Sequence, residues 1–275
     1  HRMASMTPDE LARYWYWVPD DYLNIHGAVG IHVYDLMTFM ALIGGVAIWW
    51  WMVRSCPAGL KKKAFTLLVI SLIAVVSARV FHILFYDLQT YLERPHLICR
   101  FGIGRSIHGV VAGFIIGAIV GARMLKVSIE SMARSLSLWP LFGLAAARVG
   151  NFFNSEQVGT PSDVPWAVRF YYAWDHGHIP RHPVQLYEAL WALLLAVVLA
   201  VLLYQKRRSG WLVPSLCLIG WSAGRFVTDF CRHAPGHLFG DILSTGQVLS
   251  IPFFLLGLYL LWCTLRFSKS ALPDT

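Results

Sequence analysis

Charged side chains are scarce in this sequence. Of its 275 residues, 14% are charged and 57% are hydrophobic, and these are not the proportions of an ordinary soluble domain. The hydrophobic residues come in runs, and runs of about 18 or more apolar residues are typical of membrane-spanning helices. Candidate runs lie at residues 29–53, 64–86, 108–124, 136–152, 186–204, 211–230 and 247–265. The sequence therefore predicts an all-α integral membrane protein with a bundle of about seven transmembrane helices.

Cysteine is also rare, and its spacing argues against two kinds of site. The five cysteines form no CxxC pair, so neither a metal cluster nor a disulfide framework is indicated. His176, His178 and His182 have a spacing seen in metal sites, but Pro180 and Pro183 interrupt regular geometry and no cysteine is nearby. No phosphate-binding glycine loop opens a helix. We therefore expect no metal and no nucleotide cofactor.

Lysine is missing from one side of the predicted membrane. Short cytoplasmic loops retain lysine and arginine, and twelve basic residues, among them every lysine, lie on alternate connections between the predicted spans. They are Arg54, Lys61, Lys62, Lys63, Arg123, Lys126, Arg134, Lys206, Arg207, Arg208, Arg266 and Lys269. This side is predicted to be cytoplasmic, with the N-terminus on the other side. Topology accounts for the formal charge of +8, so no nucleic-acid partner is expected.

The basic residues in the membrane or on the far side are all arginines. They are Arg2, Arg13, Arg79, Arg94, Arg100, Arg105, Arg148, Arg169, Arg181, Arg225 and Arg232. A solvated charged face would mix lysine with arginine, whereas a guanidinium binds phosphate through a planar fork and stays charged when partly buried. The pattern favours a site for an anionic lipid headgroup on that side.

Ionisable residues inside apolar spans are costly and are functional candidates by default. Those near the span ends or inside the spans are Tyr34, Asp35, Arg79, His82, His108, Arg148, Glu188, Arg225 and Asp229. Arg225 and Asp229 are four residues apart on one helical face. Two interpretations have equal weight: the pair neutralises itself, or Arg225 binds a substrate anion while Asp229 orients it.

Polar residues are densest at 148–159, where a helix of small residues turns into the long connection before the fifth span. Asn151, Asn154 and Glu156 follow Arg148 within a few residues. Such side chains can satisfy free carbonyls at a helix end, but that role does not explain an arginine inside the membrane boundary.

The predicted organisation has three parts. Residues 1–28 form an N-terminal periplasmic segment, whose first residues resemble an expression remnant. Residues 29–266 form the seven-helix transmembrane catalytic domain, with a periplasmic head at 153–185, and residues 267–275 form a cytoplasmic tail. Aromatic residues of the head fit an interfacial belt.

Two segments carry a resemblance to a known family. Residues 148–159 read Arg-Val-Gly-Asn-Phe-Phe-Asn-Ser-Glu-Gln-Val-Gly, and residues 181–188 read Arg-His-Pro-Val-Gln-Leu-Tyr-Glu. Both are similar to signatures of the prolipoprotein diacylglyceryl transferase family, as are residues 78–87, 106–109, 224–232 and 246–252. The family has seven spans with the N-terminus outside, in agreement with the topology predicted from loop charge.

The resemblance implies a multi-pass enzyme of the bacterial inner membrane with its active site toward the periplasmic leaflet. Such a transferase moves the diacylglyceryl group of phosphatidylglycerol to the lipobox cysteine of a prolipoprotein signal peptide. It forms a thioether and releases glycerol phosphate, the first step of lipoprotein maturation. Its partners are the two substrates and the bilayer, and no cofactor is implied.

The resemblance also suggests roles for individual residues. Arg148 and Arg225 are candidates to hold the phosphate that leaves, and His108 is the candidate base that removes the thiol proton. A hydrogen-bonded histidine at a helix start is the alternative for His108. Residues expected to bind substrate are Tyr34, Arg148, Asn151, Asn154, Glu156, Gly159, Asp229 and Arg232. We also expect Glu156 to pair with an arginine.

The chain departs from the family pattern at Val110, Ala147, Trp221 and Asp229. These departures affect the local shape of the predicted site and remove a tyrosine hydroxyl. Two alternatives therefore stay open: a divergent paralogue that uses another lipid or acceptor, and a membrane protein that binds anionic lipid without chemistry.

Overall fold

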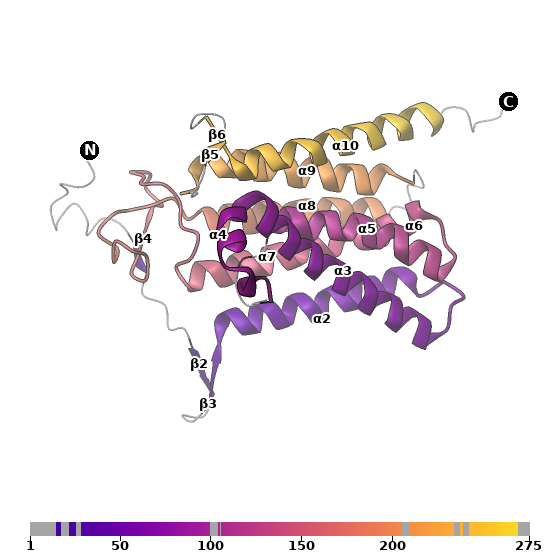
Figure 1. Ribbon diagram of the computed structural model, residues 1–275, viewed down its shortest axis with the longest axis horizontal. Coiled ribbons are helices and arrows are strands. Elements are labelled where there is room, and N and C mark those ends of the chain that lie inside the picture. Colours follow the sequence, from indigo (N-terminus) through magenta and orange to yellow (C-terminus); the bar gives the residue numbers. More distant parts are fainter. Residues whose placement is uncertain are drawn as a thin grey trace.

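The computed structural model describes residues 15–17, 22–25, 29–99, 104, 106–204, 210–233, 237–238 and 242–268. Long helices run side by side as a bundle through most of this part (Figure 1). They are α2 (Val33–Val53), α3 (Leu60–Tyr86), α5 (Ile107–Leu125), α7 (Leu138–Phe153), α8 (Val184–Tyr204), α9 (Leu212–Thr228) and α10 (Thr245–Ser268). Each apolar run of the sequence corresponds to one of these helices. The prediction of an all-α membrane protein is confirmed.

Five of the helices are long and apolar enough to cross a membrane: α2, α3, α5, α8 and α10. The other two, α7 and α9, have 16 and 17 residues. At 1.5 Å per residue they are roughly 25 Å long, against a hydrocarbon core of about 30 Å. Both pack between longer neighbours, α7 against α2 and α8, and α9 against α8 and α10. That they also span the membrane remains a prediction.

Short elements gather at one end of the bundle (Figure 1). Helix α4 (Leu88–Glu93) and the 3₁₀ turn η2 (Pro95–Cys99) follow α3, and η3 (Asp229–Cys231) follows α9. Three two-stranded sheets were not predicted: β1 (Trp15–Trp17) pairs in parallel with β4 (Val168–Phe170), β2 (Tyr22–Ile25) pairs antiparallel with β3 (Val29–His32), and β5 (His237–Leu238) pairs antiparallel with β6 (Leu243–Ser244). At the opposite end, α6 (Ile129–Leu136) joins α5 to α7.

A row of glycines brings α5 against α3. Gly109, Gly113, Gly117 and Gly121 recur every four residues on α5. A Cβ atom at Gly113 would lie 2.5 Å from the Cα of Ala74, and one at Gly109 would lie 2.4 Å from the Ser77 carbonyl oxygen. Only glycine permits so close an approach, as is common between helices in lipid. Helix α5 is the most buried of the five long apolar helices.

Large apolar side chains cover the outside of the bundle. They are exposed along α3, α8 and α10, for example at Leu72, Val76, Leu194, Val197 and Leu255. A soluble protein rarely exposes so continuous an apolar surface. The same surface suits contact with acyl chains.

Candidate active site

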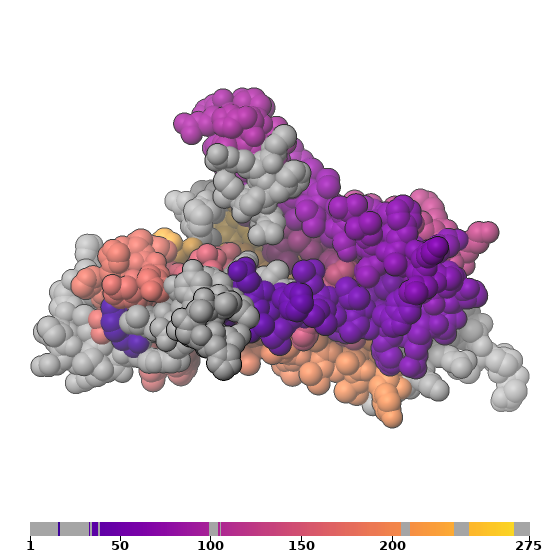
Figure 2. Space-filling view, turned by 90° about the horizontal axis from the view of Figure 1, so that it is seen from below, coloured from indigo at the N-terminus to yellow at the C-terminus, as the bar shows by residue number. Residues whose placement is uncertain are grey.

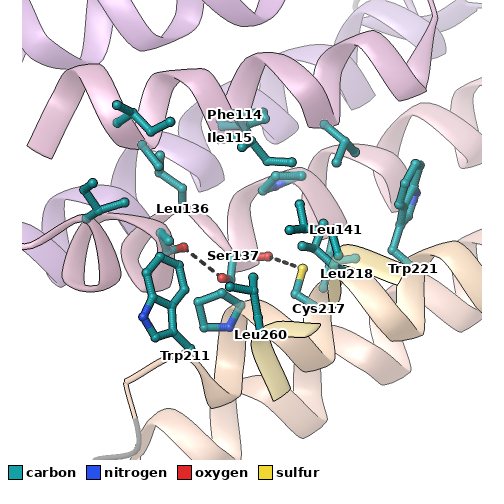
Figure 3. A pocket seen from close by; sticks show the side chains of 18 of the residues that line it. Phe114, Ile115, Leu136, Ser137, Leu141, Trp211, Cys217, Leu218, Trp221 and Leu260 are labelled. Atoms are coloured by element: carbon teal, nitrogen blue, oxygen red, sulfur yellow. Dashed lines mark hydrogen bonds between the residues drawn. The ribbon is translucent and has the colours of Figure 1, made fainter. Parts of the chain in front are cut away.

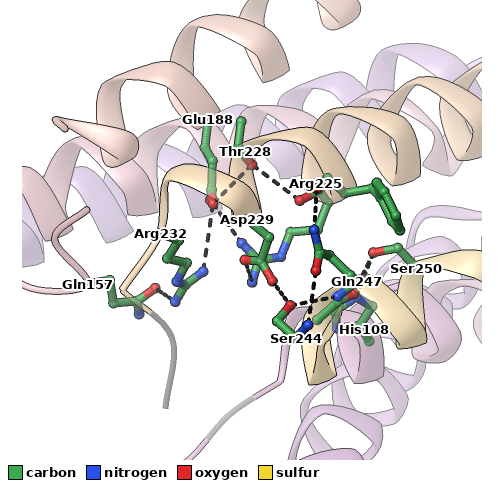
Figure 4. A network of polar contacts seen from close by, with 12 residues as sticks. His108, Gln157, Glu188, Arg225, Thr228, Asp229, Arg232, Ser244, Gln247 and Ser250 are labelled. Carbon is green, nitrogen blue, oxygen red and sulfur yellow. Dashed lines mark hydrogen bonds and ion pairs between the residues drawn. The ribbon is translucent and has the colours of Figure 1, made fainter. Parts of the chain in front are cut away.

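Three arginines converge on the carboxylate of Glu188. Arg148 of α7 pairs with its Oε2 atom, Nη1 of Arg225 lies 2.7 Å from its Oε1 atom, and Nη1 of Arg232 lies 3.7 Å from Oε1 (Figure 4). The Glu188 side chain is 4% exposed, so these charges meet away from bulk water. The helix ends that contribute them, those of α7, α8 and α9, come together at the end of the bundle opposite Arg54 and Lys61.

Arg225 also binds a second carboxylate. Its Nη2 atom lies 2.8 Å from Oδ1 of Asp229, and the hydroxyl of Ser244 donates to Oδ2 of Asp229. The predicted pair of Arg225 and Asp229 is therefore present, but it is part of a larger network. Arg148, Arg225 and Arg232 face two buried carboxylates, which leaves one positive charge in excess. A bound anion would balance that charge.

A neutral oxygen lies between two of the arginines. Oε1 of Gln157 accepts hydrogen bonds from Nη1 of Arg148 and from Nη2 of Arg232. Gln157 has a φ of 54°, in the left-handed region that a residue with a side chain rarely adopts. Burial first, and then the charges of Arg225 and Arg148, lower the pKa of Arg232. An anionic oxygen in place of the Gln157 amide would relieve this crowding of positive charge.

Of the two asparagines predicted at the site, Asn151 contacts an arginine and Asn154 contacts Glu156. Oδ1 of Asn151 accepts from Nη1 of Arg148 at 3.2 Å. The Asn151 amide donates to Glu156 at 2.9 Å, and the Asn154 amide donates to the same carboxylate at 3.4 Å. Within the described residues no ion pair joins Glu156 to an arginine: these two amides donate to its oxygens, and Arg148 contacts Glu188. The expected pairing of Glu156 with an arginine therefore stays a prediction.

Gly159 has a steric role. Its backbone N–H donates to the His182 carbonyl at 3.1 Å, and it forms a β-bridge with Arg232. A Cβ atom here would lie 2.4 Å from the His182 carbonyl oxygen and 2.7 Å from that of Cys231. Glycine therefore lets three segments meet, and this contact brings Arg232 beside residues 148–159.

His108 is fully buried, with 0% of its surface exposed. Its Nδ1 atom lies 3.2 Å from the hydroxyl of Tyr86 and its Nε2 atom lies 3.1 Å from the hydroxyl of Ser250. The ring packs against Trp221 and Phe253. The geometry matches a hydrogen-bonded histidine at a helix start, and it prevents direct contact between the imidazole and an incoming thiol. The side chain of Tyr34 lies outside the described residues.

Other arginines of the lysine-free side have structural partners. Arg79 donates to the carbonyls of Leu97 at 2.5 Å and Gly104 at 3.0 Å. Arg169 donates to the Gly177 carbonyl at 2.7 Å, and Arg181 pairs with Asp175 at 2.8 Å and lies over the ring of Trp174. Arg94 is exposed. Arg2, Arg13, Arg100 and Arg105 lie outside the described residues. The absence of lysine thus reflects two uses of arginine, one at the candidate site and one in the packing of the outer segments.

Sequence reasoning named Glu188 only as an ionisable residue inside an apolar span, and it did not single out Gln157, Tyr86 or Ser250. Glu188 ends the motif at residues 181–188 and lies inside an apolar span, and Ser250 falls in the matched segment 246–252. Those signals could have pointed to them. No feature of the sequence singles out Gln157, so only the structure reveals its contact with two arginines.

An apolar cavity of about 220 Å³ lies deeper in the bundle (Figure 3). It is formed where α5, α6, α7, α9 and α10 meet, and its walls include Phe114, Leu141, Cys217 and Leu260. Trp221 lines it and also contacts His108, so the cavity begins beside the polar residues. From Trp221 to Trp211, which also lines the cavity, α9 rises roughly 15 Å at 1.5 Å per residue.

Comparison with known proteins shows the family to which the chain belongs. The family model described as prolipoprotein diacylglyceryl transferase matches residues 21–263. Curated relatives include proteins named phosphatidylglycerol--prolipoprotein diacylglyceryl transferase from Brucella ovis and from Brucella abortus. Each is 33% identical over 254 residues, which is 86% of this chain and 88% of the relative. The chain therefore belongs to the prolipoprotein diacylglyceryl transferase family.

Proposed function

We propose that this protein transfers the diacylglyceryl group of phosphatidylglycerol to the lipobox cysteine of a prolipoprotein. The sulfur of the cysteine attacks the glycerol carbon that carries the phosphate. The carbon–oxygen bond breaks, its electron pair leaves with the phosphate oxygen, and a thioether and glycerol phosphate result. Family membership supports this chemistry.

The observation that carries the proposal is the excess of arginine over buried carboxylate. Negative charge grows on the phosphate as it departs, and donors that already point at that position stabilise the transition state most. Glu188 and Asp229 hold both Nη atoms of Arg225 in place, at 2.7 Å and 2.8 Å. Arg148 and Arg232 meet at Gln157, which a phosphate oxygen could replace. The guanidinium groups are thus oriented before the lipid arrives.

The apolar cavity suits an acyl chain of the donor. Its lining runs from Trp221 to Trp211, so it extends roughly 15 Å along α9, away from the arginines and toward the opposite end of the bundle. Because Trp221 lies one helical turn from Arg225, a lipid with its phosphate at the arginines can extend a chain into the cavity. This arrangement favours a membrane lipid over a soluble phosphate ester as the donor.

We infer that this end of the bundle faces the periplasm and that the protein is a multi-pass enzyme of the inner membrane. The site lies at the end of the bundle opposite Arg54, Lys61 and Lys126. Basic residues in short connections mark the cytoplasmic side. A periplasmic site would admit precursors once their signal peptides have entered the membrane.

The experiment is to incubate purified protein with phosphatidylglycerol and a lipobox peptide and to look for the diacylglyceryl thioether by mass spectrometry. The wild type should form the adduct. Arg225→Lys keeps the charge but cannot bridge two carboxylates, so its rate should fall about 100-fold, the usual effect of losing one such donor. The matched control is Arg94→Lys, at an exposed position, and it should keep wild-type activity.

Two results would contradict the proposal. A folded wild-type protein that binds phosphatidylglycerol but forms no thioether is a lipid-binding protein. Adduct formation from a different phospholipid, in direct competition with phosphatidylglycerol, indicates a paralogue with another donor.

A further inference from the structure

A chain of three polar side chains links α3, α5 and α10. The Tyr86 hydroxyl lies 3.2 Å from Nδ1 of His108, and Nε2 of His108 lies 3.1 Å from the hydroxyl of Ser250. The Ser250 hydroxyl in turn lies 2.8 Å from the Gly246 carbonyl oxygen, one turn earlier in α10. The contacts between His108 and Ser250 are visible in Figure 4.

The hydrogen bonds fix the direction of the chain. A serine hydroxyl has one hydrogen, and Ser250 donates it to the carbonyl of Gly246. The Ser250 oxygen must therefore accept the hydrogen of Nε2 of His108. In a neutral imidazole the other nitrogen then carries a lone pair. Nδ1 of His108 accordingly accepts the hydrogen of the Tyr86 hydroxyl.

The hydrogen-bonded side chains differ sharply in solvent exposure. His108 is 0% exposed, whereas Tyr86 is 39% exposed. Tyr86 is the last residue of α3, and its ring stacks on that of His82 with centroids 5.7 Å apart, which holds the phenol in place. Figure 2 shows a hollow in the surface beside the segment that contains α4, which follows Tyr86 directly. Tyr86 is therefore the member of this hydrogen-bonded series that a substrate can approach from the surface, whereas the imidazole of His108 is covered.

The series of hydrogen bonds from Tyr86 through His108 and Ser250 ends at Gly246, beside Arg225. A Cβ atom at Gly246 would lie 2.9 Å from Nη2 of Arg225, and the carbonyl of Gly246 receives the hydroxyl of Ser250. The phenol thus lies near the position proposed for the phosphate, where the attacked carbon would be.

We propose that Tyr86 is a catalytic residue that takes the proton of the lipobox cysteine and passes its own phenolic proton to His108. This inference rests on the function proposed above. The sulfur–hydrogen bond breaks and its electron pair stays on sulfur. The thiol proton moves to the oxygen of Tyr86, while the Tyr86 proton moves to Nδ1 of His108, which becomes an imidazolium. The thiolate then attacks carbon, and the bond from carbon to the phosphate oxygen breaks.

The proton held by His108 leaves after the carbon–sulfur bond has formed and the carbon–oxygen bond has broken. The imidazolium returns its Nδ1 proton to Tyr86, and Tyr86 releases a proton to the departing glycerol phosphate or to water. Ser250 keeps the Nε2 hydrogen throughout, so the imidazole never needs to rotate. His108 acts through Tyr86, which explains how a residue with no exposed surface can accept a proton from the substrate.

The first test removes the hydroxyl alone. Tyr86→Phe keeps the ring and its stacking on His82, so the KM for phosphatidylglycerol should be unchanged while kcat falls by about 10²- to 10³-fold, as for loss of a general base. His108→Gln should have a similar effect. The double variant should be no slower than either single variant, because the residues act as one unit. Tyr91→Phe, on the neighbouring α4, is the control and should keep wild-type kcat.

The second test bypasses the base. A lipobox peptide with selenocysteine in place of cysteine presents a selenol that is already ionised at neutral pH. With this peptide, Tyr86→Phe and His108→Gln should react at close to the wild-type rate. Neither a folding defect nor a lost lipid contact would be corrected by a change of nucleophile.

The outcomes separate the two proposals. If the wild type forms no thioether from phosphatidylglycerol and a cysteine peptide, the proposed function fails. If the wild type is active and Tyr86→Phe keeps its kcat, the role of Tyr86 is wrong. It is equally wrong if Tyr86→Phe stays as impaired with the selenocysteine peptide as with cysteine, or if the double variant multiplies the two single defects.

Discussion

Gly246 offers a direct way to disturb the arginine site without removing a charge. It lies in the first turn of α10, beside the ion pair of Arg225 and Asp229. A Cβ atom at this position would lie 2.7 Å from Oδ2 of Asp229 and 2.9 Å from Nη2 of Arg225. Real Cβ contacts are not that short, so Gly246→Ala must displace one or both partners.

The size of the displacement sets the expected effect. To reach an ordinary contact of 3.4 Å with both partners, Asp229 must move by about 0.7 Å and Arg225 by about 0.5 Å. A misplacement of about 1 Å at a reacting centre costs about 10²-fold in rate. We therefore expect kcat/KM of Gly246→Ala to fall between about 10-fold and 100-fold. Overpacking should lower the free energy of unfolding by about 1–3 kcal/mol.

Two other glycines provide matched controls. A Cβ atom at Gly143 of α7 would meet nothing within 4 Å, so Gly143→Ala should keep full activity and gain about 0.5–1 kcal/mol from helix propensity. A Cβ atom at Gly257, also in α10, would lie 2.8 Å from Cγ1 of Ile219. Gly257→Ala should therefore lose stability through the packing of α9 on α10, with little loss of kcat/KM in the folded fraction.

The assay is thioether formation at several phosphatidylglycerol concentrations, together with thermal unfolding in the same detergent. If Gly246→Ala has wild-type kcat/KM, the geometry assigned to Arg225 is wrong. If Gly257→Ala loses as much activity as Gly246→Ala at equal stability, the effect comes from general packing and the reasoning also fails.

Three further predictions concern the anion position, the helix packing and the cavity. Gln157→Glu would place a carboxylate between two arginines, where it should compete with the lipid phosphate. The KM for phosphatidylglycerol should then rise about 10- to 100-fold, because a charged hydrogen bond contributes about 1.5–3 kcal/mol. The control Gln157→Ala should not raise this KM. Gly113→Val should lower the free energy of unfolding by about 1–3 kcal/mol or prevent folding, because a Cβ atom at Gly113 would lie 2.5 Å from the Cα of Ala74 in α3. Thermal unfolding measures this loss. Cys217→Trp should fill part of the apolar cavity and shift the preference, measured by donor competition, toward phosphatidylglycerol with short acyl chains.

The helices were predictable because apolar runs are a local property of the chain. Each run became a helix, and five of these helices are long and apolar enough to cross a membrane. The pairing of Arg225 with Asp229 was equally accessible, since four residues separate neighbours on a helix face. The small strands were not predicted, because a pair such as β1 and β4 depends on two segments far apart in the sequence.

The remaining errors concern contacts between distant segments. Arg232 and Gln157 are 75 residues apart and meet only because Gly159 and neighbouring residues bring their segments together. The sequence identified His108 but could not show that Tyr86 covers it. Arg148 took its carboxylate partner from α8, at Glu188, and not from its own motif at Glu156. Motifs identified the residues, and tertiary packing decided which of them touch.

The central claim is that phosphate leaves from carbon under the control of Arg148, Arg225 and Arg232. The most direct measurement uses phosphatidylglycerol with a heavy oxygen isotope in the bond between the diacylglycerol carbon and phosphorus, together with a lipobox peptide. Attack at carbon predicts that the peptide gains diacylglyceryl as a thioether and that all of the heavy oxygen appears in the released glycerol phosphate. Heavy oxygen retained with the diacylglyceryl product would mean that the phosphorus–oxygen bond breaks, and would contradict the claim.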